Sequence, residues 1–490
     1  MEPAPLRAAA AASPMPPGAA SNPRGAPAAV LGLREAVMLI VGVVIGAGIF
    51  KAPSMVAGMA GTPEWMFGAW LLGGLVSLAG ALCYAELATA YPSAGGDYHF
   101  LHRAYGRGVS FLFGWARFSV ITTGSIALLA FVFGDYLHQA LPLFAGQATI
   151  GPAVYAVAVI AVLWAVNSRG IRAGASTQSW LTGLEILGLL LIVVAALWLA
   201  SQGTTAPGTG TPPAPAPSGQ APSPGAFGLA MVFVLLTFGG WNEAAYISAE
   251  LKDKHRNMVR ALVLSIVLIT VLYLLVTWAY WRGLGLQGMA KSEALAADLM
   301  RVAFGSVGEK VIAAMVALAA LTSINATMIV GARTNYALAR DWPQLGKLSL
   351  WDGERGTPTN AMHLQNVAAL LLVGLGAWTG SGFRSMVEFT APVFWLFFLL
   401  AGVSLFVLRA REPHVERPFR VPLYPLVPIV FCASCAYMLW SSLSYVSSQS
   451  FGGLNAAWVG VAVLAVGLLL LALLWRQRAP RGQPSRVPHP

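Results

Sequence analysis

The sequence predicts an all-α integral membrane protein with twelve transmembrane helices. Of its 490 residues, 57% belong to the apolar set and only 10% are charged. Soluble domains average about 25% charged residues. The mean hydropathy of +0.68 points in the same direction. These values exclude a disordered chain, a secreted disulfide scaffold and an ordinary soluble enzyme.

Twelve apolar segments are long enough to be membrane spans, since a helix needs about 20 residues to cross a bilayer. The third and eighth segments exceed that length, so we expect them to tilt or protrude. The segments are 36–60, 65–90, 108–138, 149–166, 179–200, 226–249, 259–281, 306–338, 362–380, 384–408, 424–445 and 453–475.

The remaining chain has the composition of tails and loops. Residues 1–33 are rich in Ala, Pro and Gly and are expected to form a flexible cytoplasmic tail, as is the basic stretch 476–490. No apolar core of a signal peptide follows a charged start. The uncharged loop 201–225 is rich in Pro, Gly, Ser and Thr, so it is expected to be a flexible external loop.

The net charge of +11 is explained by membrane orientation rather than by nucleic acid. With both termini inside, 23 of the 30 Lys and Arg residues lie in inner tails and loops and six lie outside. Inner loops of membrane proteins are enriched in these residues. The three cysteines all lie in apolar segments, and no histidine lies near Cys432 and Cys435. Small packing residues are therefore the better interpretation, and neither a metal nor a cofactor is expected.

The first and sixth spans share an unusual pattern of glycines near their centres. Residues 42–50 read GVVIGAGIF and residues 237–243 read TFGGWNE. Glycine costs about 1 kcal/mol relative to alanine within a helix, so a break is expected in each span. Interrupted helices in corresponding halves of a chain indicate a transporter binding site. The alternative for the first span is that Gly42 and Gly46 form a helix-packing face.

Five stretches together resemble the amino acid–polyamine–organocation (APC) transporters, and in particular bacterial relatives of the L-type amino acid transporters. The matching stretches follow the order and spacing of that family over residues 34 to 400. They are residues 41–53 (VGVVIGAGIFKAP), 81–98 (ALCYAELATAYPSAGGDY), 167–178 (NSRGIRAGASTQ), 238–250 (FGGWNEAAYISAE), and 323–325 (SIN) with 331–341 (GARTNYALARD).

The resemblance implies a LeuT-type fold with a 5+5 inverted repeat plus two helices. The first repeat would occupy 34–200, the second 226–408, and helices 11 and 12 would occupy 409–475. An amino acid would lie at the two breaks. Its carboxylate would meet backbone N–H groups at Gly46, Ala47 and Gly48, because a helix N-terminus favours anions. Its ammonium would meet free carbonyls near Ile45, Phe238 and Gly239, and the adjoining Ile49, Gly240, Trp241 and Asn242 complete the expected substrate-binding set.

The sequence leaves two possible roles open for several side chains near the breaks. Phe238 and Trp241 either gate the site or only pack, and the gating Phe of the L-type branch aligns with Leu236 here. Asn242 either contacts the substrate or bridges helices. Ser323 either lines the pocket or forms an interhelical hydrogen bond. Glu86, Asp97 and Arg333 are expected to form structural or gating ion pairs near the inner surface.

Ionisable residues within spans are costly and are usually paired or functional. Lys51 and Glu243 each follow a break, so we expect them to approach one another, unless Lys51 extends to the outer surface. Glu185 aligns with a lysine that, in many APC transporters, occupies the place of a sodium ion. An apolar span favours its neutral form, so Glu185 either carries a coupling proton, forms one helix–helix hydrogen bond, or binds a cation.

The predicted function is secondary transport of amino acids across a bacterial inner membrane by alternating access. A polyamine or other organic-cation transporter of the same fold is the alternative. An enzyme is not expected, because neither H-E-x-x-H nor G-x-S-x-G is present. Eukaryotic L-type relatives bond a heavy subunit through a cysteine between helices 3 and 4. Residues 138–151 contain no cysteine, so we expect no covalent partner.

Overall fold

A computed structural model describes residues 32–93, 96–142, 150–168, 174–203, 221–247, 251–350, 352, 358–380, 382–447 and 456–476. Within these ranges the chain is all-helical and contains no strand. The predicted tails at 1–31 and 477–490 and most of the predicted external loop, 204–220, lie outside the described residues.

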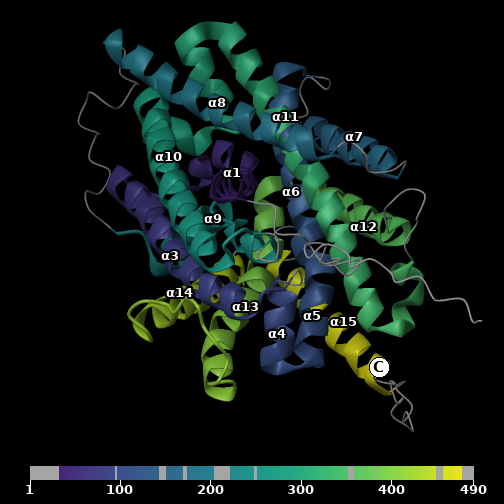
Figure 1. Ribbon diagram of the computed structural model, residues 1–490. Helices are drawn as coiled ribbons and strands as arrows, with labels where there is room; N and C mark the ends of the chain where they lie inside the picture. Colours follow the sequence, from purple (N-terminus) through teal and green to yellow (C-terminus); the bar gives the residue numbers. More distant parts are fainter. Residues whose placement is uncertain are drawn as a thin grey trace, which may run out of the picture.

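Each predicted span corresponds to one or more helices (Figure 1). The helices are α1 (Leu33–Val44), η1 (Ala47–Phe50), α2 (Ala52–Ala60), α3 (Pro63–Ala90), α4 (Gly96–Tyr105), α5 (Arg107–Ala116), η2 (Arg117–Thr122), α6 (Thr123–Ala140), α7 (Ile150–Asn167), α8 (Gly174–Ser201), α9 (Pro224–Thr237), η3 (Trp241–Ile247), α10 (Lys254–Lys291), α11 (Leu295–Asp341), η4 (Pro343–Ser349), α12 (Thr359–Trp378), α13 (Gly382–Arg411), α14 (Leu426–Ser447) and α15 (Ala456–Arg476).

Within the described residues, ten of the predicted spans are confirmed as helices that are long and apolar enough to cross a membrane. The first and sixth spans are interrupted, so their pieces are individually shorter than a membrane crossing. The first consists of α1, η1 and α2, and the sixth consists of α9 and η3. The interruptions agree with the predicted breaks, whereas the total of twelve spans stays a prediction.

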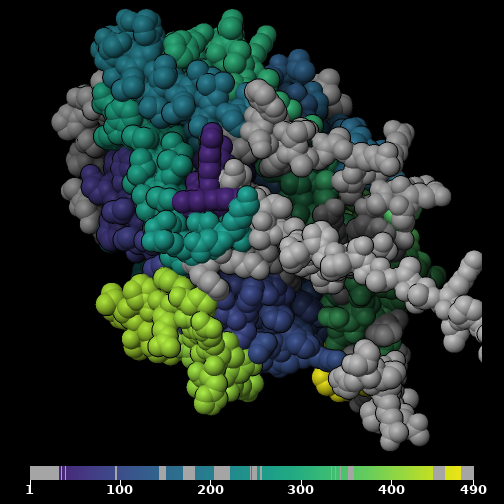
Figure 2. Space-filling model, viewed as in Figure 1, coloured from purple at the N-terminus to yellow at the C-terminus, as the bar shows by residue number. Residues whose placement is uncertain are grey.

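Helix α1 lies in the interior of the bundle, beside α8 and α10 (Figure 1). In the space-filling view it is visible only as a narrow purple strip next to the teal α10 (Figure 2). Helix α10 also runs along α3, and α6 packs against α11. The interrupted first span therefore packs against long helices with one face of α1 left open, which suits a polar site because broken backbone is tolerated only where protein or a cavity surrounds it.

Two bends shape the connection between α10 and α11. Gly285 has φ 68° and Gly305 has φ 67°, and both interrupt the helical geometry. Positive φ is strained for residues with a side chain, so glycine suits both positions. The segment between them, 286–304, contains the short connection 292–294. Glu293 and Ser292 of this connection contact Lys51 and Ser54, as described below.

Candidate substrate-binding site

The first break begins where α1 ends at Val44. Ile45 donates its N–H to Val41 O at 2.7 Å, and Gly46 donates to Val44 O at 2.8 Å. The chain then becomes extended at Gly46, with φ −97° and ψ −173°, before η1 starts. The leading N–H groups of a new helical turn have no acceptor within that helix. The break therefore presents N–H donors in the interior of the bundle.

The second break follows the end of α9 at Thr237. Phe238 and Gly239 donate N–H groups to Val234 O and Leu236 O, each at 3.0 Å. Gly240 has φ 107°, and a Cβ atom there would lie 3.1 Å from Val43 O. A side chain at this position would therefore crowd the backbone of α1. The second break thus packs against the last turn of α1.

Glycines at both breaks are accessible within a buried neighbourhood. Gly46, Gly48, Gly239 and Gly240 are all half-buried. By contrast, the side chains of Ala47, Ile45, Ile49 and Phe238 are fully buried. Accessible backbone surrounded by buried side chains is the arrangement that a small ligand contacting main-chain atoms needs.

Tyr273 of α10 joins the two breaks. Its hydroxyl lies 3.0 Å from Val44 O and 3.0 Å from Thr237 O, which are the last carbonyls of α1 and α9. Carbonyls at a helix C-terminus have no partner within their own helix. Tyr273 therefore supplies a donor that both helix ends share. The sequence analysis missed this residue, because a tyrosine in an apolar span carries no signal of its position.

The aromatic residues at the second break pack in two separate groups. The Phe238 ring lies 5.0 Å from Tyr273 and 6.2 Å from Trp70, measured between ring centroids. The Trp241 ring lies 5.1 Å from Tyr84 and 5.7 Å from Phe398. Both side chains are buried. Packing is thus established for each, and a gating role stays a prediction.

The polar residues expected near the site have different neighbours. Ser323 of α11 lies beside the first break, since a Cβ atom on Gly46 would be 3.8 Å from its hydroxyl oxygen. Asn242 donates to Asp97 Oδ2 at 3.3 Å and so bridges η3 and α4. That contact fits the bridging interpretation of Asn242, while contact with substrate stays a prediction.

Lys51 follows η1 directly and is buried in a cluster of charges. Its Nζ lies 2.9 Å from Asp135 Oδ2 of α6 and 2.5 Å from Glu293 Oε2 in the α10–α11 connection. We call Lys51, Asp135 and Glu293 the Lys51 cluster. Lys51 is only 1% exposed, so it does not extend to the surface. The Glu243 side chain lies outside the described residues, and its approach to Lys51 stays a prediction.

The sequence alone gives a signal for one of the two acidic residues of this cluster and none for the other. Asp135 is an acid within an apolar span, and this alone marks it as a paired or functional residue. Glu293 lies in a short connection, where an acidic residue is ordinary. Its partner is evident only from the fold.

Glu185 of α8 is 4% exposed, as expected for a residue inside a span. Among the described residues, no hydrogen bond or ion pair reaches its carboxyl group. Of the three interpretations of Glu185, the helix–helix hydrogen bond gains no support from the described part of the chain.

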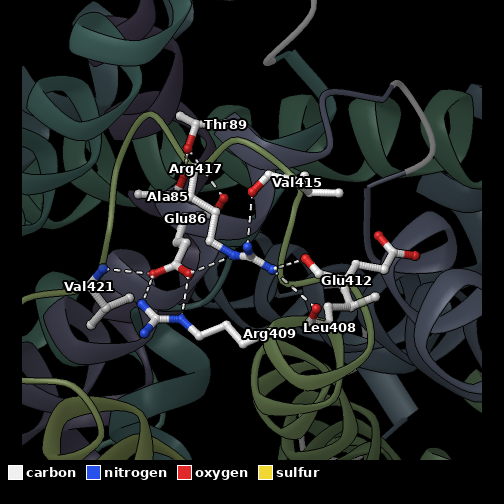
Figure 3. A network of polar contacts seen from close by, with 9 residues as sticks. All are labelled: Ala85, Glu86, Thr89, Leu408, Arg409, Glu412, Val415, Arg417 and Val421. Carbon is white, nitrogen blue, oxygen red and sulfur yellow. Dashed lines mark hydrogen bonds and ion pairs between the residues drawn. The ribbon is translucent and has the colours of Figure 1, made fainter.

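The opposite end of the bundle holds a second charge network (Figure 3). Glu86 of α3 accepts hydrogen bonds from Arg409 Nε at 2.7 Å and Arg409 Nη2 at 2.5 Å. The N–H of Val421 donates to Glu86 at 2.7 Å, and Arg417 Nε lies 3.6 Å away. Glu86 is fully buried. It therefore anchors α3 to α13 and to the segment leading into α14, which confirms an ion pair for this residue.

The described residues contain no group of three or more His, Cys, Asp and Glu side chains able to hold a metal ion. A model of the amino acid permease family matches residues 31–473. The chain belongs to the amino acid permease family. It is accordingly a multi-pass membrane transport protein and not an enzyme.

Relatives of this permease occur in animals and bacteria. The Asc-type amino acid transporter 1 of Mus musculus is 30% identical over 456 residues, which cover 91% of this chain and 82% of the relative. The b(0,+)-type amino acid transporter 1 of Homo sapiens is 29% identical over 415 residues, covering 84% and 81%. The serine/threonine exchanger SteT of Bacillus subtilis (strain 168) is 27% identical over 418 residues, covering 84% and 91%.

Proposed function

We propose that this permease exchanges amino acids across a bacterial inner membrane by alternating access. The observation that carries the proposal is the meeting of two broken helices, whose last carbonyls share the Tyr273 hydroxyl and whose glycines at the breaks are half-buried. Relatives named as amino acid transporters, among them a bacterial exchanger, support this substrate class and this mode of transport.

The substrate would bind across the two breaks. Its carboxylate would accept hydrogen bonds from the N–H groups of Ala47 and Gly48, where the start of η1 favours an anion. The Gly46 N–H, which the sequence analysis also assigned to the carboxylate, already donates to Val44 O. Its ammonium would lie near the Ile45 carbonyl and the carbonyls of the second break, from Phe238 to Gly240. Residues 34–200 and 226–408 would form the two repeats that alternate around this site, with 409–475 appended.

The orientation follows from the distribution of Lys and Arg. Because inner loops hold most of these residues, both termini would face the cytoplasm. The Glu86 network then lies at the cytoplasmic end, and the Lys51 cluster lies at the external end.

Counterflow into proteoliposomes tests the function. Vesicles preloaded with one unlabelled amino acid should take up the same radiolabelled amino acid, for at least one of the twenty common amino acids. Polyamines, tested in parallel, address the alternative substrate class. If no amino acid exchanges while a polyamine does, the alternative function is correct. If nothing exchanges, transport of both classes is refuted.

The absence of a cysteine in residues 138–151 supports function without a covalent partner. On a non-reducing gel of native membranes, the protein should migrate as it does after reduction. A band that shifts to a lower apparent mass on reduction would contradict this.

A further inference from the structure

A cavity of about 850 Å³ lies at the end of the bundle that the proposed orientation places outside. Its lining comes from α2, α6, α7, the end of α10, the α10–α11 connection, α11, α12 and α13, and it includes all three residues of the Lys51 cluster. We call it the Lys51 cavity. Its volume falls within the range of small-molecule sites. Lys51 donates its backbone N–H to Gly48 O at 3.1 Å, so the cavity ends beside the first break.

The Lys51 ammonium uses all three of its donors inside the cluster. Its acceptors are Asp135 Oδ2, Glu293 Oε2 and the backbone carbonyl of Glu293. A lysine ammonium has three N–H donors. Both contacts to Glu293 attach the α10–α11 connection to the start of α2, and Ser54 strengthens the attachment by donating to Ser292 O at 2.8 Å. The connection is therefore fastened to Lys51 and to the first turn of α2, directly after η1.

Glu293 is the residue of the cluster that can most easily give up its contact with Lys51. Its side chain is 80% exposed, whereas that of Asp135 is 17% exposed. Two other cations line the cavity, and they already bind carboxylates on their own helices: Arg301 binds Asp298, and Arg384 binds Glu388. Those carboxylates are 21% and 0% exposed. Glu293 can leave its cation for water more easily than either.

We propose that the Lys51 cavity is an outer binding site at which an α-amino acid inserts between Lys51 and Glu293. The substrate carboxylate takes the two Lys51 donors that Glu293 releases, and the substrate ammonium meets the Glu293 carboxylate. One ion pair thereby becomes two, and no buried charge loses its partner. The insertion separates the connection from α2 and opens the path to the break.

This arrangement selects for a zwitterion. An amine alone would bind Glu293 but would leave two Lys51 donors buried without acceptors, which is costly for a charged group. A carboxylate alone would satisfy Lys51 but would add a third negative charge beside Asp135 and Glu293. Only a molecule with both groups leaves the Lys51 donors and the Glu293 carboxylate all paired. The inference rests on the proposed function, because it takes the substrate to be an amino acid.

Thiol labelling of Ser54→Cys reports on the opening of the connection. Ser54 is 1% exposed and lines the cavity, so a thiol there becomes reactive only when the connection moves. The three native cysteines are replaced by alanine, and a membrane-impermeant maleimide is added outside proteoliposomes. The zwitterionic probe is a mixture of the twenty common amino acids. Ethanolamine and 3-hydroxypropanoate each carry one of the two charges of serine.

We expect the amino acid mixture to raise the labelling rate several-fold, and each single-charge compound at the same concentration to raise it less. Glu293→Gln should label rapidly without amino acids and should lose their effect. Glu293→Asp restores a carboxylate and should recover part of the response to amino acids. A loss caused by misfolding is thereby distinguished from a loss caused by the missing charge. Glu64→Gln is the matched control, since Glu64 is an exposed carboxylate at the same end of the bundle and outside the cavity lining.

A Gly48→Leu variant separates the outer site from the break, because it obstructs the break and leaves the cluster residues in place. The labelling response should persist in it. The inference is overturned if the response disappears in Gly48→Leu, if Glu293→Gln responds like the parent, or if ethanolamine acts as strongly as the amino acids. It is also overturned if vesicles that exchange amino acids show no response. Absence of exchange in the parent refutes the proposed function instead.

Discussion

Removal of the Tyr273 hydroxyl tests whether one side chain connects the two breaks. In Tyr273→Phe, the last carbonyls of α1 and α9 lose the donor that lies 3.0 Å from each. The ring stays, so its packing against Phe238 and Trp70 is kept. Leaving a buried acceptor unsatisfied costs about 1–3 kcal/mol. We expect the variant to lose about that much stability.

Tyr280 on the same helix provides a matched control. It is also fully buried, but its hydroxyl has no hydrogen-bond partner among the described residues. Tyr280→Phe removes the same atom and should be neutral or slightly stabilising. Unfolding in mixed detergent and SDS micelles measures both variants against the parent. Equal effects of the two substitutions would refute the bridging role of Tyr273.

The same substitution should weaken substrate binding, because the geometry of both breaks depends on their carbonyls. If the whole of about 1–3 kcal/mol appeared in binding, affinity would fall about 5- to 150-fold. Counterflow at varied substrate concentration measures this. Unchanged half-saturation in Tyr273→Phe would show that the breaks keep their shape without the hydroxyl.

Three further substitutions test separate parts of the protein. Gly48→Ala places a Cβ at 3.6 Å from Thr237, an ordinary contact, and should retain exchange, whereas the bulk of Gly48→Leu should abolish exchange without preventing membrane insertion. Glu185→Gln imitates a protonated carboxyl, so it should keep counterflow and lose accumulation driven by a pH gradient. Glu86→Gln leaves Arg409 without its carboxylate and should cost about 3–5 kcal/mol in unfolding experiments. The exposed pair of Glu412 and Arg103 should contribute less than about 1 kcal/mol, so Glu412→Gln is its control.

Each of these has a clear contrary result. Normal affinity in Gly48→Leu removes Gly48 from the site. If Glu185→Gln still accumulates substrate under the same pH difference, Glu185 is not the proton carrier. If Glu86→Gln is no less stable than Glu412→Gln, burial of the network has no energetic consequence.

The sequence predicts the helices and the breaks because both depend on local composition. Long apolar segments can satisfy their backbone only as helices, and glycines at positions 46, 48, 239 and 240 weaken two of them locally. The partners of charged residues cannot be predicted in this way, because they depend on contacts between distant segments. Lys51 pairs with Asp135 and Glu293, which are 84 and 242 positions away, and no local pattern encodes those distances.

Tyr273 illustrates the same limit. Thirteen tyrosines occur in the chain, and the composition around this one does not distinguish it from Tyr280, seven positions later. Only the crossing of α10 past both helix ends places the Tyr273 hydroxyl, and not that of Tyr280, beside the last carbonyls of α1 and α9.

The Glu86 network also has a consequence for how the chain is made. Glu86 and Arg409 are separated by 323 positions. At a synthesis rate of about 5–20 residues per second, Glu86 is made roughly 15–65 s before its arginine. A carboxylate stranded in lipid for that time would hinder insertion of α3. Because it stands in the last turns of α3, four residues before the helix ends at Ala90, it can stay hydrated at the membrane surface until α13 arrives. Completion of the nascent bundle, rather than insertion of α3, is then the step that withdraws Glu86 from water.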